Sequence, residues 1–212
     1  MGGADDSSPG APAREPYRTV AGRGEAAFTV RGSEFVGYVA PATDPDAAAA
    51  FLEEVRGEHP DATHVVPASR VRDDDGVLRE RADDDGEPTG SAGKPALNVL
   101  VQRDLENVVA AVVRYYGGTN LGVGGLARAY GRAVKEAVDD AGVTERRPRE
   151  RFAAVVAYDD SGTVRSVLES AGADFEADYG EDVRFAVSVP VDEAAALRDR
   201  LRSATGGRVD VE

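Results

Sequence analysis

The stretch Asn107–Asp140, NVVAAVVRYYGGTNLGVGGLARAYGRAVKEAVDD, decides the fold of the region around it because three patterns follow one another in it. Its first part, Asn107–Tyr116, is a continuous run rich in valine and alanine, which is typical of a strand buried on both faces. A glycine-rich loop follows, and then apolar residues recur every three or four positions, which predicts one apolar face of a helix. Such a strand–loop–helix unit can present backbone N–H groups at the start of the helix to an anion.

The loop of this unit contains five glycines, and two interpretations of them stay open. They are Gly117, Gly118, Gly122, Gly124 and Gly125. Glycine permits both a positive φ and a close approach of the backbone, so the loop either folds tightly over its own domain or holds a phosphate or nucleotide-like ligand. A GxGxxA pattern is present from Gly122 to Ala127, but the loop is too long for the tight dinucleotide-binding turn. The sequence also lacks the Gly-Lys-Ser/Thr of a Walker A loop.

Two blocks of uncommon sequence extend this pattern. Asp84–Pro95 reads DDGEPTGSAGKP and Arg114–Tyr130 reads RYYGGTNLGVGGLARAY. These blocks resemble DDGEPxGxAGxP and RYxGGxxLGxGGLxRAY of the IMPACT/YigZ family, and the resemblance covers Tyr17 to about Val143. It implies an N-terminal domain similar to the second domain of ribosomal protein S5. It also implies a C-terminal DUF1949-like domain similar to domain V of elongation factor G.

The composition is strongly acidic throughout. The 212 residues include 39 acidic and 25 basic side chains, a net charge of −14, and the excess is the same before and after Phe152. Lys94 and Lys135 are the only lysines, and there is no Trp. Evenly spread acidity with few lysines favours a protein adapted to high salt, where screening removes self-repulsion, so we interpret the chain as a haloarchaeal-type member of the family. The absence of Cys excludes disulfides and thiol catalysis.

The N-terminal residues 1–16 are rich in Gly, Ala, Pro and Ser, which predicts a disordered tail. They lack the apolar core of a signal peptide. No apolar run approaches the roughly 18 residues that a membrane-spanning helix needs. We therefore expect a cytoplasmic protein with no membrane partner.

Residues 17–143 are expected to form an α+β domain in which the helices pack on one face of the sheet. Alternating apolar residues and turn signals predict its strands, and an Asp-Pro or Pro start predicts its first two helices. The expected strands are Tyr17–Val20 (an edge strand), Ala26–Val30, Glu34–Ala40, Thr63–Val71, Val77–Arg81 and Asn107–Tyr116. The expected helices begin at Pro45, Pro95 and about Leu126.

A polar stretch, residues 144–151 (TERRPRER), is expected to be a linker, and residues 152–212 a ferredoxin-like domain of order βαββαβ. The expected elements of this domain are Phe152–Tyr158, Ser161–Ala171, Asp174–Tyr179, Asp182–Pro190, Asp192–Ala204 and Arg208–Val211. The apolar face of its last helix is assigned to Ala195, Ala196 and Leu201.

The family blocks also supply the candidate ligand-binding or family-motif cleft. Two carboxylates and a histidine could perform acid–base work, and arginine offers a fork of donors to phosphate or carboxylate. Arg114 and Arg128 equally fit ion pairs with the acidic loop, and Tyr115 either stacks or packs. The cleft residues are His64, Asp84, Asp85, Gly86, Glu87, Pro88, Arg114, Tyr115, Gly117, Gly118, Gly122, Gly124, Gly125 and Arg128.

The sequence predicts no metal, no cofactor and no catalytic residue. The acidic residues from Asp73 to Glu87 lack EF-hand spacing and are typical of a solvated surface. His59 and His64 are the only histidines, which disfavours a histidine metal site. His59 itself is interpreted as an ordinary residue at a helix end.

Two arginine groups are candidates for nucleic-acid binding, although the net charge argues against a broad phosphate-binding surface. They are Arg146, Arg147, Arg149 and Arg151 in the linker, and Arg198, Arg200 and Arg202 on the last helix. The family's basic residues beside Ser33 and Phe35 are replaced here by Gly32 and Glu34.

Two functions from different classes are compatible with the sequence. The resemblance implies a non-enzymatic protein of translational control, whose partner is the ribosome, RNA or a translation factor, with no DNA specificity. Eukaryotic IMPACT competes for the activator of a kinase that senses uncharged tRNA, but this depends partly on an RWD domain that the sequence lacks. The alternative is an enzyme or binder acting on a small phosphate-bearing or peptide-like ligand. The oligomeric state is not indicated.

The acidic composition predicts a salt-dependent stability. Raising KCl from dilute buffer to molar concentration should raise the unfolding midpoint, because screening weakens the repulsion among carboxylates. Thermal unfolding followed by circular dichroism measures this. A protein that is fully folded in dilute buffer and gains nothing from molar KCl would contradict the adaptation to high salt.

Overall fold

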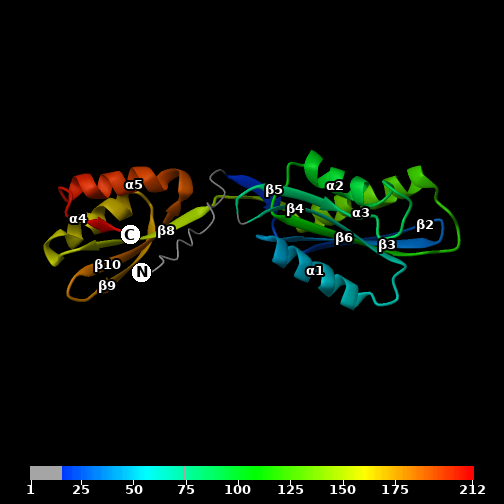
Figure 1. Ribbon diagram of the computed structural model, residues 1–212, viewed down its shortest axis with the longest axis horizontal. Helices are drawn as coiled ribbons and strands as arrows, with labels where there is room; N and C mark the ends of the chain where they lie inside the picture. Colours follow the sequence, from blue (N-terminus) through cyan, green and yellow to red (C-terminus); the bar gives the residue numbers. More distant parts are fainter. Residues whose placement is uncertain (1–15, 74) are drawn as a thin grey trace, which may run out of the picture. The chain divides into compact units, whose positions relative to one another are not determined.

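The computed structural model describes residues 16–73 and 75–212, so the predicted tail lies outside the described residues except for Pro16. The described chain divides into two compact units, Tyr17–Arg146 and Arg147–Glu212. Each unit combines a sheet with helices and has its own hydrophobic core, which confirms the α+β class (Figure 1). No helix within the described ranges is long and apolar enough to cross a membrane.

The sheet of the first unit is built around one fully apolar strand. It has the antiparallel order β2-β3-β6-β4-β5, with β2 Gly24–Val30, β3 Ser33–Pro41, β6 Val108–Tyr115, β4 His64–Arg72 and β5 Leu78–Ala82. The residues Val108–Val113 are all fully buried. The apolar run therefore predicted the central strand of the sheet correctly, and its burial on both faces follows from cover on both sides.

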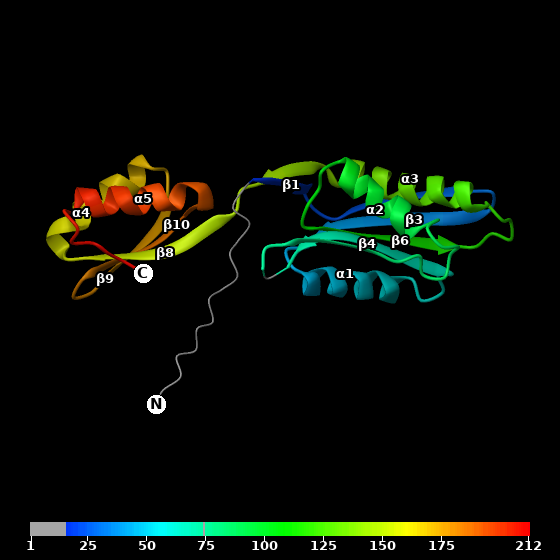
Figure 2. The same cartoon turned by 45° about the horizontal axis from the view of Figure 1, so that its top comes forward.

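Helices cover both faces of this sheet, so the expectation that they share one face is wrong. They are α1 (Pro45–Glu58), α2 (Gly93–Gln102) and α3 (Val123–Ala141). Figure 2 shows α1 on one side of the sheet and α2 and α3 on the other. Val109 and Val113 pack in the core beneath α1, whereas Val112 packs beneath α3. A strand that is apolar at every position needs cover on both faces.

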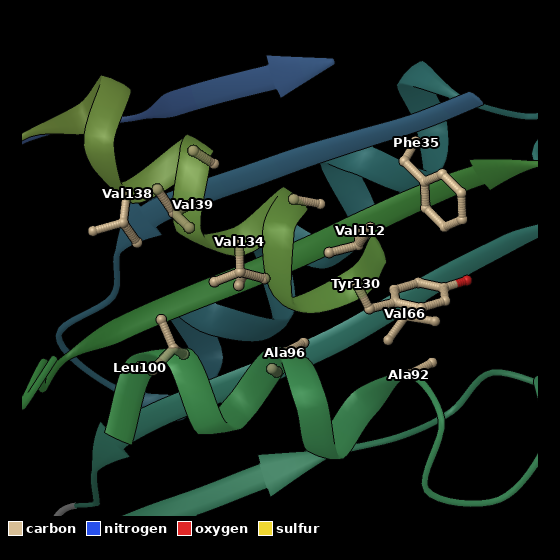
Figure 3. Close-up of a cluster of buried hydrophobic side chains, with 14 of the residues drawn as sticks. Phe35, Val39, Val66, Ala92, Ala96, Leu100, Val112, Tyr130, Val134 and Val138 are labelled. Carbon is tan, nitrogen blue, oxygen red and sulfur yellow. The ribbon is translucent and has the colours of Figure 1, made fainter. Parts of the chain in front are cut away.

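Glycine lets α3 lie directly on the sheet. A Cβ atom on Gly37 of β3 would lie 2.4 Å from the carbonyl oxygen of Ala133 in α3. The close approach brings the helix side chains Tyr130, Val134 and Val138 onto the sheet, among Phe35 and its neighbours (Figure 3). The position of α3 is thus set by backbone contact as well as by side-chain packing.

Two local predictions fail where strands pair over long distances. β1 (Tyr17–Val20) is not an edge strand of the main sheet, because it pairs with β7 (Val143–Arg146) in a separate two-stranded sheet. The stretch expected to be a linker is also mostly strand: it supplies β7 and the start of β8 (Arg149–Val156), with Arg147 and Pro148 between them. Backbone pairing orders this polar segment although it has no apolar pattern.

The second unit has the predicted βαββαβ order. Its elements are β8, α4 (Tyr158–Ser170), β9 (Asp174–Tyr179), β10 (Val183–Pro190), α5 (Val191–Ala204) and β11 (Asp210–Val211). The strands form an antiparallel sheet of order β11-β8-β10-β9, which is a ferredoxin-like topology. The buried face of α5 consists of Ala194, Leu197 and Leu201, so the assignment of Ala195 and Ala196 to it is wrong.

The contact between α3 and the sheet can be tested at Gly37. Gly37→Ala should lower the free energy of unfolding by about 1–3 kcal/mol, because the added methyl group cannot fit against the Ala133 carbonyl. Urea unfolding measures the change. The control is Gly57→Ala at an exposed position of α1. A Cβ there meets nothing within 4 Å, and alanine should stabilise the helix by up to about 1 kcal/mol. A neutral Gly37→Ala would contradict the close approach.

Candidate functional site

Strand register places two of the candidate site residues, Arg114 and His64, next to each other and places Phe35 on the other side of Arg114. Arg114 of β6 is paired with Phe35 of β3 on one side and with His64 of β4 on the other. Because directly paired residues point to the same face of a sheet, all three side chains lie on the face that α3 covers. The sheet thus presents one cation between an aromatic ring and an imidazole.

Glu87 from the acidic loop is the acceptor at the centre of this group. Its Oε1 accepts hydrogen bonds from Arg114 Nη1 at 2.5 Å and from the Tyr130 hydroxyl of α3 at 2.7 Å. His64 Nε2 lies 3.9 Å from the same oxygen. Glu87 and Arg114 are both buried rather than lining an open cleft. Of the two alternatives for Arg114, the structure therefore has the ion pair with the acidic loop.

Burial controls the protonation of Tyr130. Burial first, and then the hydrogen bond to Glu87, hold the pKa of the Tyr130 hydroxyl far above its usual value. The phenol therefore keeps its proton and acts as a hydrogen-bond donor to the carboxylate. Its ring packs edge-on against Phe35, at 5.4 Å between centroids, which fixes its place in the core (Figure 3).

The Arg114 guanidinium is held from several directions. It lies over the rings of Phe35 and Tyr116, at 5.5 and 5.3 Å from their centroids. Its Nη2 donates to Ser33 Oγ at 3.3 Å, and the same oxygen accepts from the Gly117 backbone N–H at 3.1 Å. Arg114 thus connects the sheet, the acidic loop and the first residue of the glycine loop.

Asp85 attaches the acidic loop to β4. Its carboxylate accepts from the Val65 backbone N–H at 2.7 Å, and its carbonyl oxygen accepts from His64 Nδ1 at 2.6 Å. Asp85 and Gly86 both have a positive φ, at 47° and 83°, which makes the turn that directs Glu87 inward. His64 Nδ1 therefore donates to the loop backbone, which holds the imidazole against Asp85.

Asp84 closes the loop and caps α2. Its carboxylate accepts from the backbone N–H groups of Gly90, Ala92 and Gly93, at 2.6, 3.0 and 2.8 Å. Burial works to raise the pKa of Asp84, but these amide hydrogen bonds outweigh it and hold the pKa below its usual value. The Asp84 carboxylate takes the place of a capping side chain, because the N-cap residue of α2, Ala92, has none that can accept a hydrogen bond.

The glycine loop packs on the β2–β3 turn. A Cβ on Gly117 would lie 1.9 Å from the carbonyl carbon of Gly32, so only glycine fits there. Tyr116, directly before Gly117, and Val123, the first residue of α3, are 46% and 57% exposed, and α3 begins without a side-chain cap. The contact at Gly117 is therefore structural, while the side chains at the two ends of the loop face solvent.

Arg128 has a different environment from Arg114. It is exposed, makes no ion pair with any residue that the structure describes, and lines a pocket of about 350 Å³. We call this the arginine pocket; its lining residues are Val30, Arg31, Leu121, Gly125, Arg128, Ala129 and Arg132. Arg31 was missed in the sequence because it lies one position outside the family's basic segment, in the β2–β3 turn.

Tyr115 lies on the opposite face of the sheet, beneath α1, so its inclusion in the cleft is wrong. Its hydroxyl is 2.8 Å from His59 Nδ1, and His59 Nε2 is 2.8 Å from the Tyr38 hydroxyl. Burial raises the pKa of Tyr38 to about 12. His59 thus joins two strands to the end of α1. The sequence contains this information, because neighbouring residues of a strand point to opposite faces and Tyr115 follows Arg114 in β6.

The arginines predicted to bind nucleic acid are distributed over β7, β8, the two residues between these strands, and α5. Arg149 forms an ion pair with Asp174 at 2.7 Å, Arg202 lies 3.5 Å from Asp199, and Arg198 is paired with Glu150. Arg200 donates to Ser170 at 2.8 Å. Arg151 lines a separate groove on the open face of the β8–β10–β9 sheet, and Arg146 and Arg147 are exposed. Nucleic-acid binding by this set stays a prediction.

Within residues 16–73 and 75–212, no group of three or more His, Asp or Glu side chains is arranged to hold a metal ion. The Asp83 carboxylate accepts from the Asp85 backbone N–H at 2.7 Å, and Asp73 pairs with Arg79. These carboxylates are used in loop structure.

Comparison with known proteins assigns the family. A family model described as the Impact N-terminal domain matches residues 31–138, which include the Glu87 network and the glycine loop. "IMPACT family member YvyE" of Bacillus subtilis is 34% identical over 92% of this chain and 90% of its own length. The chain belongs to the IMPACT family. A second model, a domain of unknown function (DUF1949), matches residues 155–208 in the second unit.

Other members agree with this assignment. "IMPACT family member YigZ" of Escherichia coli is 33% identical over 86% of the chain and 90% of its own length. A solved crystal structure of a hypothetical protein is 30% identical and has a TM-score of 0.67, covering 93% of this chain and 96% of that one. The similarity in sequence and in fold therefore extends along nearly the whole chain.

The buried ion pair predicts a large effect of neutralising Glu87. Glu87→Gln should lower the free energy of unfolding by about 3 kcal/mol or more, because Arg114 is left buried without a counter-charge. Tyr130→Phe removes one hydrogen bond to the same oxygen and should cost only about 1 kcal/mol. Urea unfolding of both variants measures the difference. Equal, small effects would contradict the central role of the pair.

Asp84 predicts a dependence of stability on pH. Its folded-state pKa lies below its unfolded value of about 3.9, so its contribution is present above that value and is lost as pH falls through the folded pKa. The difference in unfolding free energy between wild type and Asp84→Asn should therefore shrink as pH is lowered from about 6 to about 2.5. A pH-independent difference would contradict this linkage.

Proposed function

We propose that this protein is a non-enzymatic binding protein of translational control that contacts RNA on the ribosome. The observation that carries this is the division of the family motif between two environments. Glu87 is bound by Arg114 and Tyr130 in the interior, with the His64 ring beside them, so these residues build the fold. The part of the motif that reaches solvent offers groups that can bind a partner. We therefore assign this part a role in binding.

The binding surface is the glycine-loop face, which we define as Tyr116, Val123, Arg31 and Arg128. Tyr116 and Val123 are exposed large side chains at the two ends of the loop, and the two arginines have no carboxylate partner in the part of the chain that the structure describes. Exposed aromatic rings on which bases stack, combined with guanidinium groups for phosphate, are the usual means by which proteins bind unpaired RNA.

Charge limits the size of this surface. With a net charge of −14, the protein cannot gain affinity from a broad cationic face, and only local patches attract phosphate. The glycine-loop face is such a patch. The link to translation comes from the family, since the resemblance of the two sequence blocks to IMPACT proteins implies a role in translational control.

Ribosome association tests the proposal. The wild type should co-sediment with ribosomes from a high-salt lysate, and Tyr116→Ala/Arg128→Ala should bind at least about tenfold more weakly, because one stacking ring and one phosphate donor are lost. Western blotting of pellet and supernatant measures the bound fraction.

A matched control removes the same types of side chain elsewhere. Tyr158→Ala/Arg56→Ala changes an exposed tyrosine of the second unit and an exposed arginine of α1, and it should associate as the wild type does. Failure of the wild type to co-sediment would refute ribosome binding. Loss in the control alone would refute the glycine-loop face as the contact.

A further inference from the structure

Three arginines and an apolar floor line the arginine pocket. Arg31 comes from the β2–β3 turn, and Arg128 and Arg132 come from successive turns of α3. The floor includes Leu121 and Ala129. A volume of about 350 Å³ lies at the lower end of the roughly 300–1,000 Å³ that small-molecule sites occupy. The pocket can therefore hold a small anionic group with an apolar or ring-shaped body.

The three arginines differ in how far their charge is neutralised. Arg132 donates to Glu136 at 2.8 Å and lies 4.0 Å above the centre of the Phe28 ring, so two contacts hold it at the wall and its charge is partly compensated. Arg31 and Arg128 make no ion pair within the described residues, although many arginines of this acidic chain do. The pocket therefore keeps an excess of positive charge in a protein with a net charge of −14.

The backbone at Arg31 points to a use of its side chain. Arg31 and Gly32 form a two-residue turn with φ angles of 47° and 83°, between Val30 and Ser33, which pair across the hairpin. Turns of this type favour Asn or Gly at the first position, because few other residues adopt a positive φ without strain. Arginine there adds nothing to the turn, so its guanidinium is what it contributes.

We propose that the arginine pocket binds a phosphate monoester. At neutral pH a monoester carries about 1.5 to 2 negative charges and three terminal oxygens, which match two uncompensated guanidinium groups and a third that is fixed at the wall. A phosphodiester carries a single charge and two free oxygens, and so leaves part of the pocket's charge unmatched. The apolar floor takes the organic part of the ester.

This inference rests on the proposed function, which assigns binding to the glycine-loop face. It goes further by naming a phosphate monoester as the group that this face recognises. Two sources have this chemistry: a free nucleotide and the 5′-phosphorylated end of an RNA strand. Both present the same dianionic group on a nucleoside, so one pocket accommodates either. The binding experiments below distinguish them.

Calorimetric titration with AMP and with adenosine tests the phosphate requirement. AMP should bind at one site and adenosine should not. Arg31→Ala/Arg128→Ala should weaken AMP binding by at least about tenfold, since each arginine supplies a charge-assisted hydrogen bond. The control Arg56→Ala/Arg165→Ala removes the exposed Arg56 and the partly exposed Arg165 elsewhere and should bind AMP as the wild type does. All variants change surface positions, and their unfolding midpoints should equal that of the wild type.

The pH dependence separates a monoester from other anions. The second pKa of a phosphate monoester is about 6, whereas arginine stays charged throughout the accessible range. AMP should therefore bind several-fold more weakly at about pH 5 than at about pH 7.5, because the ligand loses its second charge. Binding that is equal at both pH values would overturn recognition of the dianion.

RNA hexamers with a 5′-phosphate or a 5′-hydroxyl identify the source. Preferential binding of the 5′-phosphorylated hexamer through Arg31 and Arg128 assigns the pocket to an RNA end, and binding of AMP without either hexamer assigns it to a free nucleotide. Equal binding of both hexamers with no binding of AMP overturns the monoester site and leaves ribosome association intact. Lost co-sedimentation with retained AMP binding refutes the proposed function alone.

Discussion

The buried ion pair between Glu87 and Arg114 is the interaction on which the rest of the first unit depends. Placing both charges in the interior costs several kcal/mol of desolvation, which is recovered only if each has good partners. Glu87 gains a second donor in Tyr130, and Arg114 gains Ser33 and two aromatic rings. The pair thus holds together the acidic loop, the central strand and α3.

The same helix connects this interior network to the surface. Tyr130 and Arg128 are two positions apart on α3, about 200° around the helix axis, so one points to Glu87 while the other lines the arginine pocket. Gly37 allows the helix to approach the sheet closely enough for the Tyr130 hydroxyl to reach the carboxylate. The geometry of the pocket is therefore set by the packing beneath it.

The distribution of charge explains how an acidic protein can offer a site to an anion. The carboxylates of the acidic loop are turned inward or onto backbone N–H groups: Asp84 binds three amides, Asp85 binds Val65 and Glu87 is buried. Their charge is thus compensated locally. Exposed ion pairs elsewhere contribute little each, so the folded structure depends more on the buried network than on them.

The sequence by itself determined the elements whose evidence is local: the apolar run of β6, the amphipathic α3, the order of the second unit and the two family blocks. Only the tertiary structure decided which distant residues meet. It placed α1 on the far face of the sheet, paired β1 with β7, paired Arg114 with Glu87, and brought Arg31 to Arg128. Periodicity records the burial of a residue within its own element, whereas partners separated by tens of residues are selected by the packing of the whole unit.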